Sequence, residues 1–594
     1  MNHPQGETRH DTADRHEPAA FADDQADAAT TRLVRSSVVV GLGTVLSRIT
    51  GFLRVSAIAA IGFDRLTDVY NVANSTPNIV YELLLGGILT ATLVPLYVEY
   101  ADRRDPRAAD AINTVAMVGL LVISVLGVIA APWIIKLYTL RLDTADRASQ
   151  QALATALLRL FMPQIFFYGV TALLTAMLNA RRRFAAAAFA PALNNVIVIG
   201  VFLAVPRLST KTLTVANVRA DTGLVLLLGL GTTAGIVAMA LVLWPALRGT
   251  GARLRFVRDW RHPAVRQLAR LSGWTIGYVV ANQLAFWVAL FLAYGRSGDA
   301  SVYLAAFILF QLPHGLFAVS IMTALGPELA ARANRGDLDA FRREFSGGLR
   351  LLTLVVLPAS GIMVVLARPI VTALLRYGDF TARSASLTAE TLAAFGIGLL
   401  FFSLYLYTLR AFYAMQDTRT PFLLNCFENG LNIVLALALY PSLGVQGLAL
   451  SWSIAYFVAS VLSLLALRRK LGRLDGRRTV DVGWRIAVAA ALATALAAGL
   501  GSAVGQASAA RAIVACALAL TAAGVTYLVT LRVLGVRELA LVAAALTRRR
   551  VDAAAPIEPG SEPTMPDPAE PSGKPFDASG SGSGAVPTDR PGDA

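Results

Sequence analysis

Two arginines, Arg48 and Arg54, stand inside an apolar stretch that reads SVVVGLGTVLSRITGFLRVSAIAAIG. In a helix, six residues separate them by about 9 Å along the axis and about 120° around it, so both can line one wide cavity. An arginine near the centre of a membrane span costs roughly 2.5–3.5 kcal/mol and therefore needs an anionic partner. That partner is either a protein carboxylate, with Asp68 and Glu82 as candidates, or a bound anion. The planar guanidinium fork suits a diphosphate.

A second polar pattern lies in a later apolar run. Asn425, Glu428, Asn429 and Asn432 recur at i, i+3, i+4 and i+7, which places them on one face of a helix. Such a face can coordinate Na⁺ or carry a proton, or it can hold helices together through hydrogen bonds. Both interpretations stay open. Other polar residues inside apolar runs are candidates for a cavity or a gate: Asn78, Glu82, Asn195, Asn282 and Gln283.

The sequence lacks the motifs that would carry enzyme chemistry. It contains no GxxxxGK-S/T phosphate loop, no HExxH pair and no Cys/His cluster. The two cysteines, Cys426 and Cys516, lie in apolar runs, which excludes a disulfide framework and a zinc site. We therefore expect no enzyme activity, no cofactor and no metal. Any transport would draw its energy from a Na⁺ or proton gradient or from the membrane potential.

The elements that must position these residues follow from composition. Of the 594 residues, 56% are hydrophobic and 15% are charged, and the mean hydropathy is +0.58. The net charge of +15 lies in short basic clusters between apolar runs, which is typical of a polytopic membrane protein and excludes a nucleic-acid partner. Apolar runs of about 20 residues without alternation predict an all-α fold of membrane-spanning helices. We expect fourteen spans, near 36–60, 68–98, 111–135, 152–179, 184–206, 222–247, 270–294, 302–329, 348–374, 387–412, 420–440, 444–467, 483–504 and 510–534.

The basic residues between the spans predict the orientation. Alternate loops hold the rich clusters, such as Arg181–Arg183 and Arg468–Lys470, and the positive-inside rule makes these loops cytoplasmic. An even number of spans then puts both termini inside. Residues 1–31 are polar and acidic, so we expect no cleavable signal before the first span. The predicted location is the cytoplasmic (inner) membrane.

An internal repeat predicts the arrangement of the spans. Segment 67–105 is echoed by 300–337, where Val69-Tyr70 matches Val302-Tyr303 at a shift of 233. Spans 1–6 therefore resemble spans 7–12, related by a pseudo-twofold axis along the membrane normal, as in transporters with their site between the halves. The expected divisions are a disordered acidic tail, two six-span lobes, two added spans, and a short helix with a disordered tail: 1–32, 33–250, 251–470, 471–535 and 536–594.

Several short segments form a recognisable combination. They are LSRITGFLR (46–54), TD (67–68), PN (77–78), LVPL (93–96), FAPALNN (189–195) and FYAMQDTRTP (412–421). Together they resemble the MurJ (MviN) family of lipid II flippases, from about residue 33 to 535, and in particular its actinobacterial members without a pseudokinase domain. The resemblance implies a MATE-like fold of two lobes, with two additional C-terminal helices that form a lipid-facing groove.

The resemblance also implies a function. It is the movement of lipid II, the undecaprenyl-diphosphate-linked muropeptide, from the inner to the outer leaflet by alternating access during peptidoglycan synthesis. Membrane lipids and cell-wall synthesis or division proteins are further implied partners. The same likeness puts Ser47, Arg48, Arg54 and Asp68 in the substrate-binding cavity.

This sequence departs from well-known Gram-negative members at three places. They carry an arginine where Tyr81 stands, an Asp-Arg pair where Phe307-Ile308 stands, and an acidic residue in place of Val55. A less basic cavity is therefore expected. The alternatives are a flippase for another lipid-linked oligosaccharide, a MATE-type cation or drug antiporter, and a scaffold for cell-wall enzymes. Two cavity arginines would repel cations, which favours a flippase over an antiporter.

Overall fold

The structure is a computed structural model, and it describes twelve stretches of the chain. These are residues 18–85, 97, 99–100, 106–142, 144–181, 183–248, 256–257, 259–260, 262–271, 273–472, 474–503 and 508–539. The chain divides into two compact units, residues 1–539 and 540–594. The second unit, which includes most of the predicted short helix and tail at 536–594, lies outside the described residues. So does 86–96, the end of the second predicted span.

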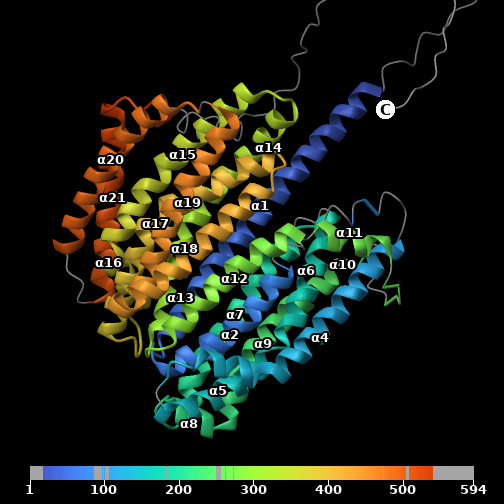
Figure 1. The fold of residues 1–594 in the computed structure, drawn as a ribbon, viewed down its shortest axis with the longest axis vertical. Helices are drawn as coiled ribbons and strands as arrows, with labels where there is room; N and C mark the ends of the chain where they lie inside the picture. The colour runs from blue at the N-terminus through green and yellow to red at the C-terminus, as the bar shows by residue number, and fades with distance from the viewer. Residues whose placement is uncertain are drawn as a thin grey trace, which may run out of the picture. The chain divides into compact units, whose positions relative to one another are not determined.

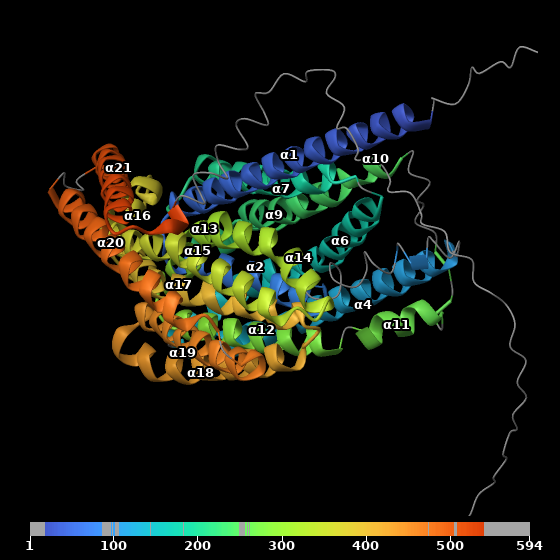
Figure 2. The ribbon, with the colours of Figure 1, turned by 90° about the horizontal axis from the view of Figure 1, so that it is seen from above.

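The first half of the chain forms a group of helices that pack on one another (Figure 1), called the first helix group below. Its members are α1 (Pro18–Ala59), α2 (Arg65–Leu85), α4 (Pro106–Tyr138), α5 (Thr144–Phe161), α6 (Gln164–Ala180), α7 (Ala185–Leu208), α8 (Val215–Ala220), α9 (Thr222–Leu241) and α10 (Leu243–Leu247). The short helix α11 (Pro263–Leu271) follows and lies beside α4 (Figure 2).

The second helix group packs around α17 and α19. It consists of α12 (Gly273–Ala293), α13 (Asp299–Pro313), the π-helical segment η2 (His314–Ala318), α14 (Val319–Asn334), α15 (Leu338–Val365), α16 (Ala367–Leu375), α17 (Ala382–Ala414), α18 (Arg419–Leu443) and α19 (Val445–Leu471). Two last helices, α20 (Gly476–Ala503) and α21 (Ala509–Val533), lie at its edge beside α15 and α16 (Figure 1).

Every regular element in the described residues is helical, which confirms the all-α prediction. Twelve segments within them are long and apolar enough to cross a membrane. The other two predicted spans correspond to α2 and α12. Helix α2 is rich in polar residues, and the apolar part of α12, Gly277–Ala293, is shorter than a usual span. The number fourteen therefore stays a prediction, as do the lobe boundaries.

One boundary differs from the prediction. Helix α1 begins at Pro18, inside the stretch 1–32 that we expected to be a disordered tail. Proline is well accommodated in the first turn of a helix, and the following residues are rich in alanine, the strongest helix former. Local helix propensity thus extends α1 ahead of its apolar span.

Small side chains join α20 and α21 to the second helix group. Ala493 and Ala497 of α20 and Ala519 and Ala523 of α21 are fully buried with Leu366 in one cluster. Small residues let helix backbones approach closely, which is how helices associate in membranes without a hydrophobic driving force.

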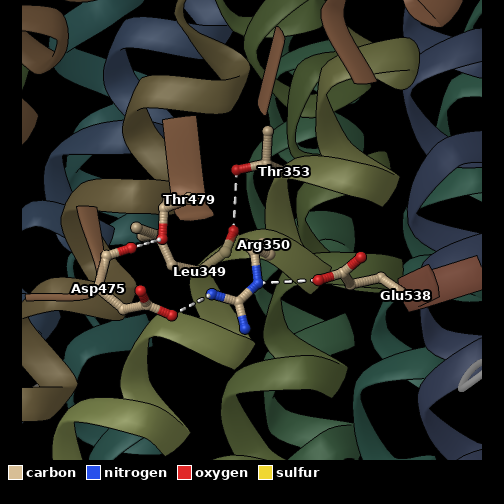
Figure 3. A network of polar contacts seen from close by, with 6 residues as sticks. All are labelled: Leu349, Arg350, Thr353, Asp475, Thr479 and Glu538. Atoms are coloured by element: carbon tan, nitrogen blue, oxygen red, sulfur yellow. Dashed lines mark hydrogen bonds and ion pairs between the residues drawn. The ribbon is translucent and has the colours of Figure 1, made fainter. Parts of the chain in front are cut away.

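A network of charged residues fixes the same two helices near one end (Figure 3). Arg350 of α15 donates from Nε to Glu538, which follows α21, at 2.9 Å. Its Nη1 lies 3.4 Å from the carboxylate of Asp475, which precedes α20. Arg350 and Glu538 are each 7% exposed, so this pair is largely shielded from water. One arginine therefore ties together α15 and the ends of α20 and α21.

Candidate functional site: a cavity between the helix groups

A cavity of about 640 Å³ lies between the two helix groups. Helices α1, α2 and α7 form one wall, and α12 and α13 form the other. Its lining includes five predicted site residues: Ser47, Arg48, Arg54, Asn78 and Asn195. Among the described residues that line it, Arg48 and Arg54 alone carry a charge. The opposite wall is apolar where Phe307 and Ile308 stand, the two residues that replace the Asp-Arg pair.

Among the described residues, no carboxylate pairs with either arginine. Within the described part of the chain, neither Arg48 nor Arg54 takes part in an ion pair. The Arg48 guanidinium lies beside Gly315 of η2, where an added Cβ would be 3.5 Å from its Nη2. Nearby, Asn195 donates to the carbonyl of Ser47 at 3.3 Å and to Thr50 at 3.2 Å, which holds α7 against α1. The guanidinium groups are thus available to an anion.

Asp68 is a substrate-binding candidate that the structure places elsewhere. Its side chain is fully buried and lines neither this cavity nor the second one described below. It accepts hydrogen bonds from the backbone N–H of Gly298 at 2.6 Å and from Ser301, through N at 3.0 Å and Oγ at 2.8 Å. Free N–H groups at a helix start favour a carboxylate. Asp68 of α2 therefore caps α13 in the other helix group.

Further contacts between the groups lie at the same end, where α1 ends and α2 begins. Ser56 donates to the carbonyl of Leu374 at 3.0 Å, and Arg65 donates to that of Tyr294 at 2.7 Å. The backbone N–H of Asp379 donates to the carbonyl of Ala60 at 2.9 Å. We call this set of contacts, from residues 56–71 to residues 294–301 and 374–379, the closed end.

Two glycines let the backbones touch at the closed end. Gly298 has φ 88° and Gly378 has φ 59°, both in the left-handed region. A Cβ on Gly298 would lie 2.7 Å from the carbonyl oxygen of Phe63, and one on Gly378 would overlap the carbonyl oxygen of Ala60. Each position therefore requires glycine for its backbone conformation and for the space.

A second cavity, of about 450 Å³, adjoins the first. Asn78, Phe286, Phe307 and Gln311 line both. The remaining lining brings in more of the predicted candidates, together with aromatic side chains: Glu82, Asn282, Gln283, Asn429, Asn432, Tyr278, Tyr303, Phe402, Trp452 and Tyr456. Most of this wall comes from the second helix group.

The polar face of α18 lies at and behind this second cavity. Asn425 and Asn429 both donate to Oδ1 of Asn282 on α12, at 3.2 and 3.1 Å. Ser451 donates to Oδ1 of Asn432 at 3.0 Å. Asn425 and Glu428 are fully buried. Oδ1 of Asn425 and both carboxylate oxygens of Glu428 make no hydrogen bond of good geometry in the described residues, and the side chains of Tyr405 and Tyr456 lie beside Asn425 and Glu428, respectively. One face of α18 thus carries both features: hydrogen bonds to a neighbouring helix, and buried oxygens that could receive a cation.

Sequence reasoning missed one wall of the first cavity. This wall consists of four polar residues of α2, namely Asn71, Asn74, Ser75 and Asn78. These four residues follow the spacing i, i+3, i+4 and i+7, which is the pattern that singled out the polar face of α18. Applying the same test to 65–85 would have found this wall.

A polar, charged cavity between two packed groups of membrane helices is the arrangement typical of transporters of the alternating-access class. Solved structures share this fold. The lipid II flippase MurJ in an inward closed conformation aligns with a TM-score of 0.68 at 20% identity, covering 84% of this chain and 99% of that one. A multidrug resistance MATE family transporter in an inward-facing conformation aligns with a TM-score of 0.58 at 15% identity, covering 72% and 95%. The MATE-like fold is confirmed.

Sequence comparison narrows the class. The family model described as "Lipid II flippase MurJ" matches residues 58–521. The lipid II flippase MurJ of Burkholderia cenocepacia is 31% identical over 74% of this chain and 84% of its own length. A probable lipid II flippase MurJ of Rhizobium meliloti is 28% identical over 73% and 80%. The chain belongs to the MurJ family, which confirms the resemblance.

Proposed function

We propose that this chain moves lipid II from the inner to the outer leaflet of the cytoplasmic membrane for peptidoglycan synthesis. The observation that carries the proposal is the pair Arg48 and Arg54. They line the cavity between the helix groups, and they have no carboxylate partner in the described residues. We infer the cargo from the family, because its curated relatives are named lipid II flippases.

The three parts of the cargo fit three environments. A guanidinium–phosphate pair is much less screened in a cavity walled by helices than in water, so the arginines hold the diphosphate. The sugar-peptide head needs the polar cavity because it cannot cross hydrocarbon. The polyprenyl tail stays in lipid along the helices α20 and α21.

The orientation and the cycle follow from the same proposal. Both termini are cytoplasmic, and the closed end faces outward. Cargo enters from the inner side, and the contacts of Asp68, Arg65 and Ser56 then separate while the helix groups close behind it. Enzymes that consume lipid II on the outer face are the expected partners, because they remove the product.

We also propose an ion site that drives this cycle. Buried oxygens of Asn425 and Glu428 make no hydrogen bond of good geometry in the described residues, and they belong to the face of α18 whose Asn425 and Asn429 bond to Asn282. An intramembrane carboxylate of this kind suits Na⁺ or a proton. Binding there would bias the second helix group, because Asn282 joins α12 to α18.

Depletion in the native cell tests the function. The amount of lipid II in each leaflet is measured after the protein is removed and no substitute transporter is present. We expect lipid II to accumulate in the inner leaflet, and re-expression restores the outer pool. Unchanged outer-leaflet lipid II rejects the proposal. A changed outer pool of some other lipid-linked glycan identifies that glycan as the cargo instead.

A further inference from the structure

The passage between the two cavities has a composition of its own. The four residues that line both cavities are two aromatic rings, Phe286 and Phe307, and two amides, Asn78 and Gln311. The ring centroids lie 6.5 Å apart, with their planes at 40°. All four side chains are only half-buried, so they present surface to the cavities.

The amides of the passage retain free hydrogen-bonding groups. In the described part of the chain, the side chain of Gln311 makes no hydrogen bond, and neither does that of Gln283 in the second cavity. Asn78 donates its Nδ2 to the carbonyl of Asn74 at 3.0 Å, which leaves its Oδ1 free to accept. Each neutral amide offers both donors and acceptors.

This combination recognises a sugar better than it recognises the other parts of the cargo. The C–H face of a pyranose ring packs on an aromatic face, while its hydroxyl and acetamido groups bond to amides. A diphosphate requires cations, and among described lining residues these are Arg48 and Arg54 of the first cavity. A polyprenyl chain is a hydrocarbon and forms no hydrogen bonds with amides. The two cavities, about 640 and 450 Å³, are each of the size that binds a small organic group.

We propose that Asn78, Phe286, Phe307 and Gln311 form a subsite for the N-acetylated sugar that is joined to the diphosphate. The diphosphate then lies beside Arg48 and Arg54, and the remainder of the head group extends into the second cavity. The inference rests on the function proposed above. It gives Phe307, which stands where Gram-negative relatives carry a charged residue, a role as a stacking surface for the sugar.

The test measures equilibrium binding to the purified full chain in lipid nanodiscs. One probe is a polyprenyl diphosphate without sugar, and the other is the same lipid carrying one N-acetylated amino sugar and no peptide. Phe307→Leu keeps apolar volume and removes the ring face, Phe307→Tyr keeps the ring, and Gln311→Ala removes the amide. Phe291→Ala is the matched control, because this ring lies on α12, stacks on Trp287 and lines neither cavity. Arg54→Ala reports on the diphosphate.

We expect the wild-type chain to prefer the sugar-bearing lipid, and Phe307→Leu and Gln311→Ala to weaken its binding by up to about tenfold each. Binding of the sugar-free lipid should stay unchanged in both variants. Phe307→Tyr, which keeps the ring, should bind the sugar-bearing lipid more tightly than Phe307→Leu does, and Phe291→Ala should behave as the wild type. Equal binding of both probes by the wild type, or equal loss of both in Phe307→Leu, overturns the sugar subsite.

The same binding data distinguish failure of the sugar subsite from failure of the proposed function. If the wild type binds both lipids equally and Arg54→Ala weakens both, the diphosphate site stands and the sugar subsite is wrong. If the wild type binds neither lipid, both proposals fall. A preference for the sugar-bearing lipid that only Phe307→Leu and Gln311→Ala remove supports both.

Discussion

Asp68 and Ser301 are joined by two hydrogen bonds although 233 positions separate them in the chain. That separation equals the shift that aligns Val69-Tyr70 with Val302-Tyr303 in the internal repeat. Equivalent positions of two copies related by a twofold axis meet at the axis. The pair therefore lies where the repeat would place its axis, within the closed end that joins the two helix groups.

Replacing Asp68 by Asn should loosen the closed end. Asparagine keeps one accepting oxygen and replaces the other by N–H₂, so it cannot accept from both Gly298 and Ser301, and hydrogen bonds to a charged group are worth about 1.5–3 kcal/mol each. The reporter is Ser47→Cys in a chain that also carries Cys426→Ser and Cys516→Ser. We expect Asp68→Asn to make this cysteine react at least tenfold faster with an impermeant reagent added from the outer side. Asp221→Asn is the control, because Asp221 caps α9 through Leu224 within the first helix group. Equal rates for the two variants would show that Asp68 does not hold the groups together.

Gly378→Ala should destabilise the closed state more than Gly336→Ala does. Both glycines have left-handed φ, 59° and 70°, so alanine costs roughly 1–2 kcal/mol at either position. Only at Gly378 does the added Cβ also overlap a backbone atom, the oxygen of Ala60, while Gly336 faces open space. Thermal unfolding in detergent should show the larger drop for Gly378→Ala. Matching melting temperatures would contradict the close backbone contact.

The apolar runs predicted the helices. The cost of a charge inside a membrane predicted that Arg48 and Arg54 face a cavity, because an arginine in a span must be paired or must face a polar space. The role of Asp68 could not be predicted in the same way. Its partner Ser301 is remote in the chain, and a carboxylate that caps a distant helix has the same local sequence as one that faces a cavity. The early start of α1 was missed for a different reason, since hydropathy marks the membrane-spanning part and not the end of the helix.

Arg48→Ala and Arg54→Ala should each abolish or severely reduce complementation of a depleted strain. Each removes half of the positive charge that faces the cavity among the described lining residues. Lysine should be partly tolerated at one of the two positions at most, because it keeps the charge but loses the bidentate fork. Membrane amounts of each variant are measured in parallel. Wild-type flipping by both alanine variants, at normal protein levels, would reject the diphosphate clamp.

Glu428→Gln should remove the ion dependence of transport and leave lipid binding intact. The substitution keeps the shape of a fully buried side chain but cannot bind Na⁺ or exchange a proton as a carboxylate does. Transport in vesicles is measured with Na⁺ and proton gradients imposed separately. The control is Glu390→Gln, since Glu390 bonds to Ser386 and Gln446 at the exposed surface. If the variant responds to both gradients as the wild type does, the polar face of α18 serves only to hold helices together through hydrogen bonds.

Arg350→Met should destabilise the protein by about 3–5 kcal/mol, because it leaves the buried Glu538 without its partner. The double variant Arg350→Met with Glu538→Gln should recover part of that loss, since no unpaired charge then remains. Arg332→Met, which breaks the exposed pair with Glu328, should cost less than about 1 kcal/mol. Denaturant unfolding of the four proteins checks this. A double variant no more stable than Arg350→Met alone would mean that the unpaired Glu538 is not the source of the loss.

The closed end also has an electrical consequence. Backbone meets backbone there, with the Asp379 N–H on the oxygen of Ala60 and Gly378 against the same carbonyl, so we infer that the closed end seals the cavity from the side proposed to face outward. In the proposed orientation, most of the membrane voltage then falls across this layer. A diphosphate that leaves the cavity outward crosses that drop, which is worth roughly 2.3 kcal/mol per charge for each 100 mV. With the cytoplasm negative, the voltage itself pushes the anionic cargo outward.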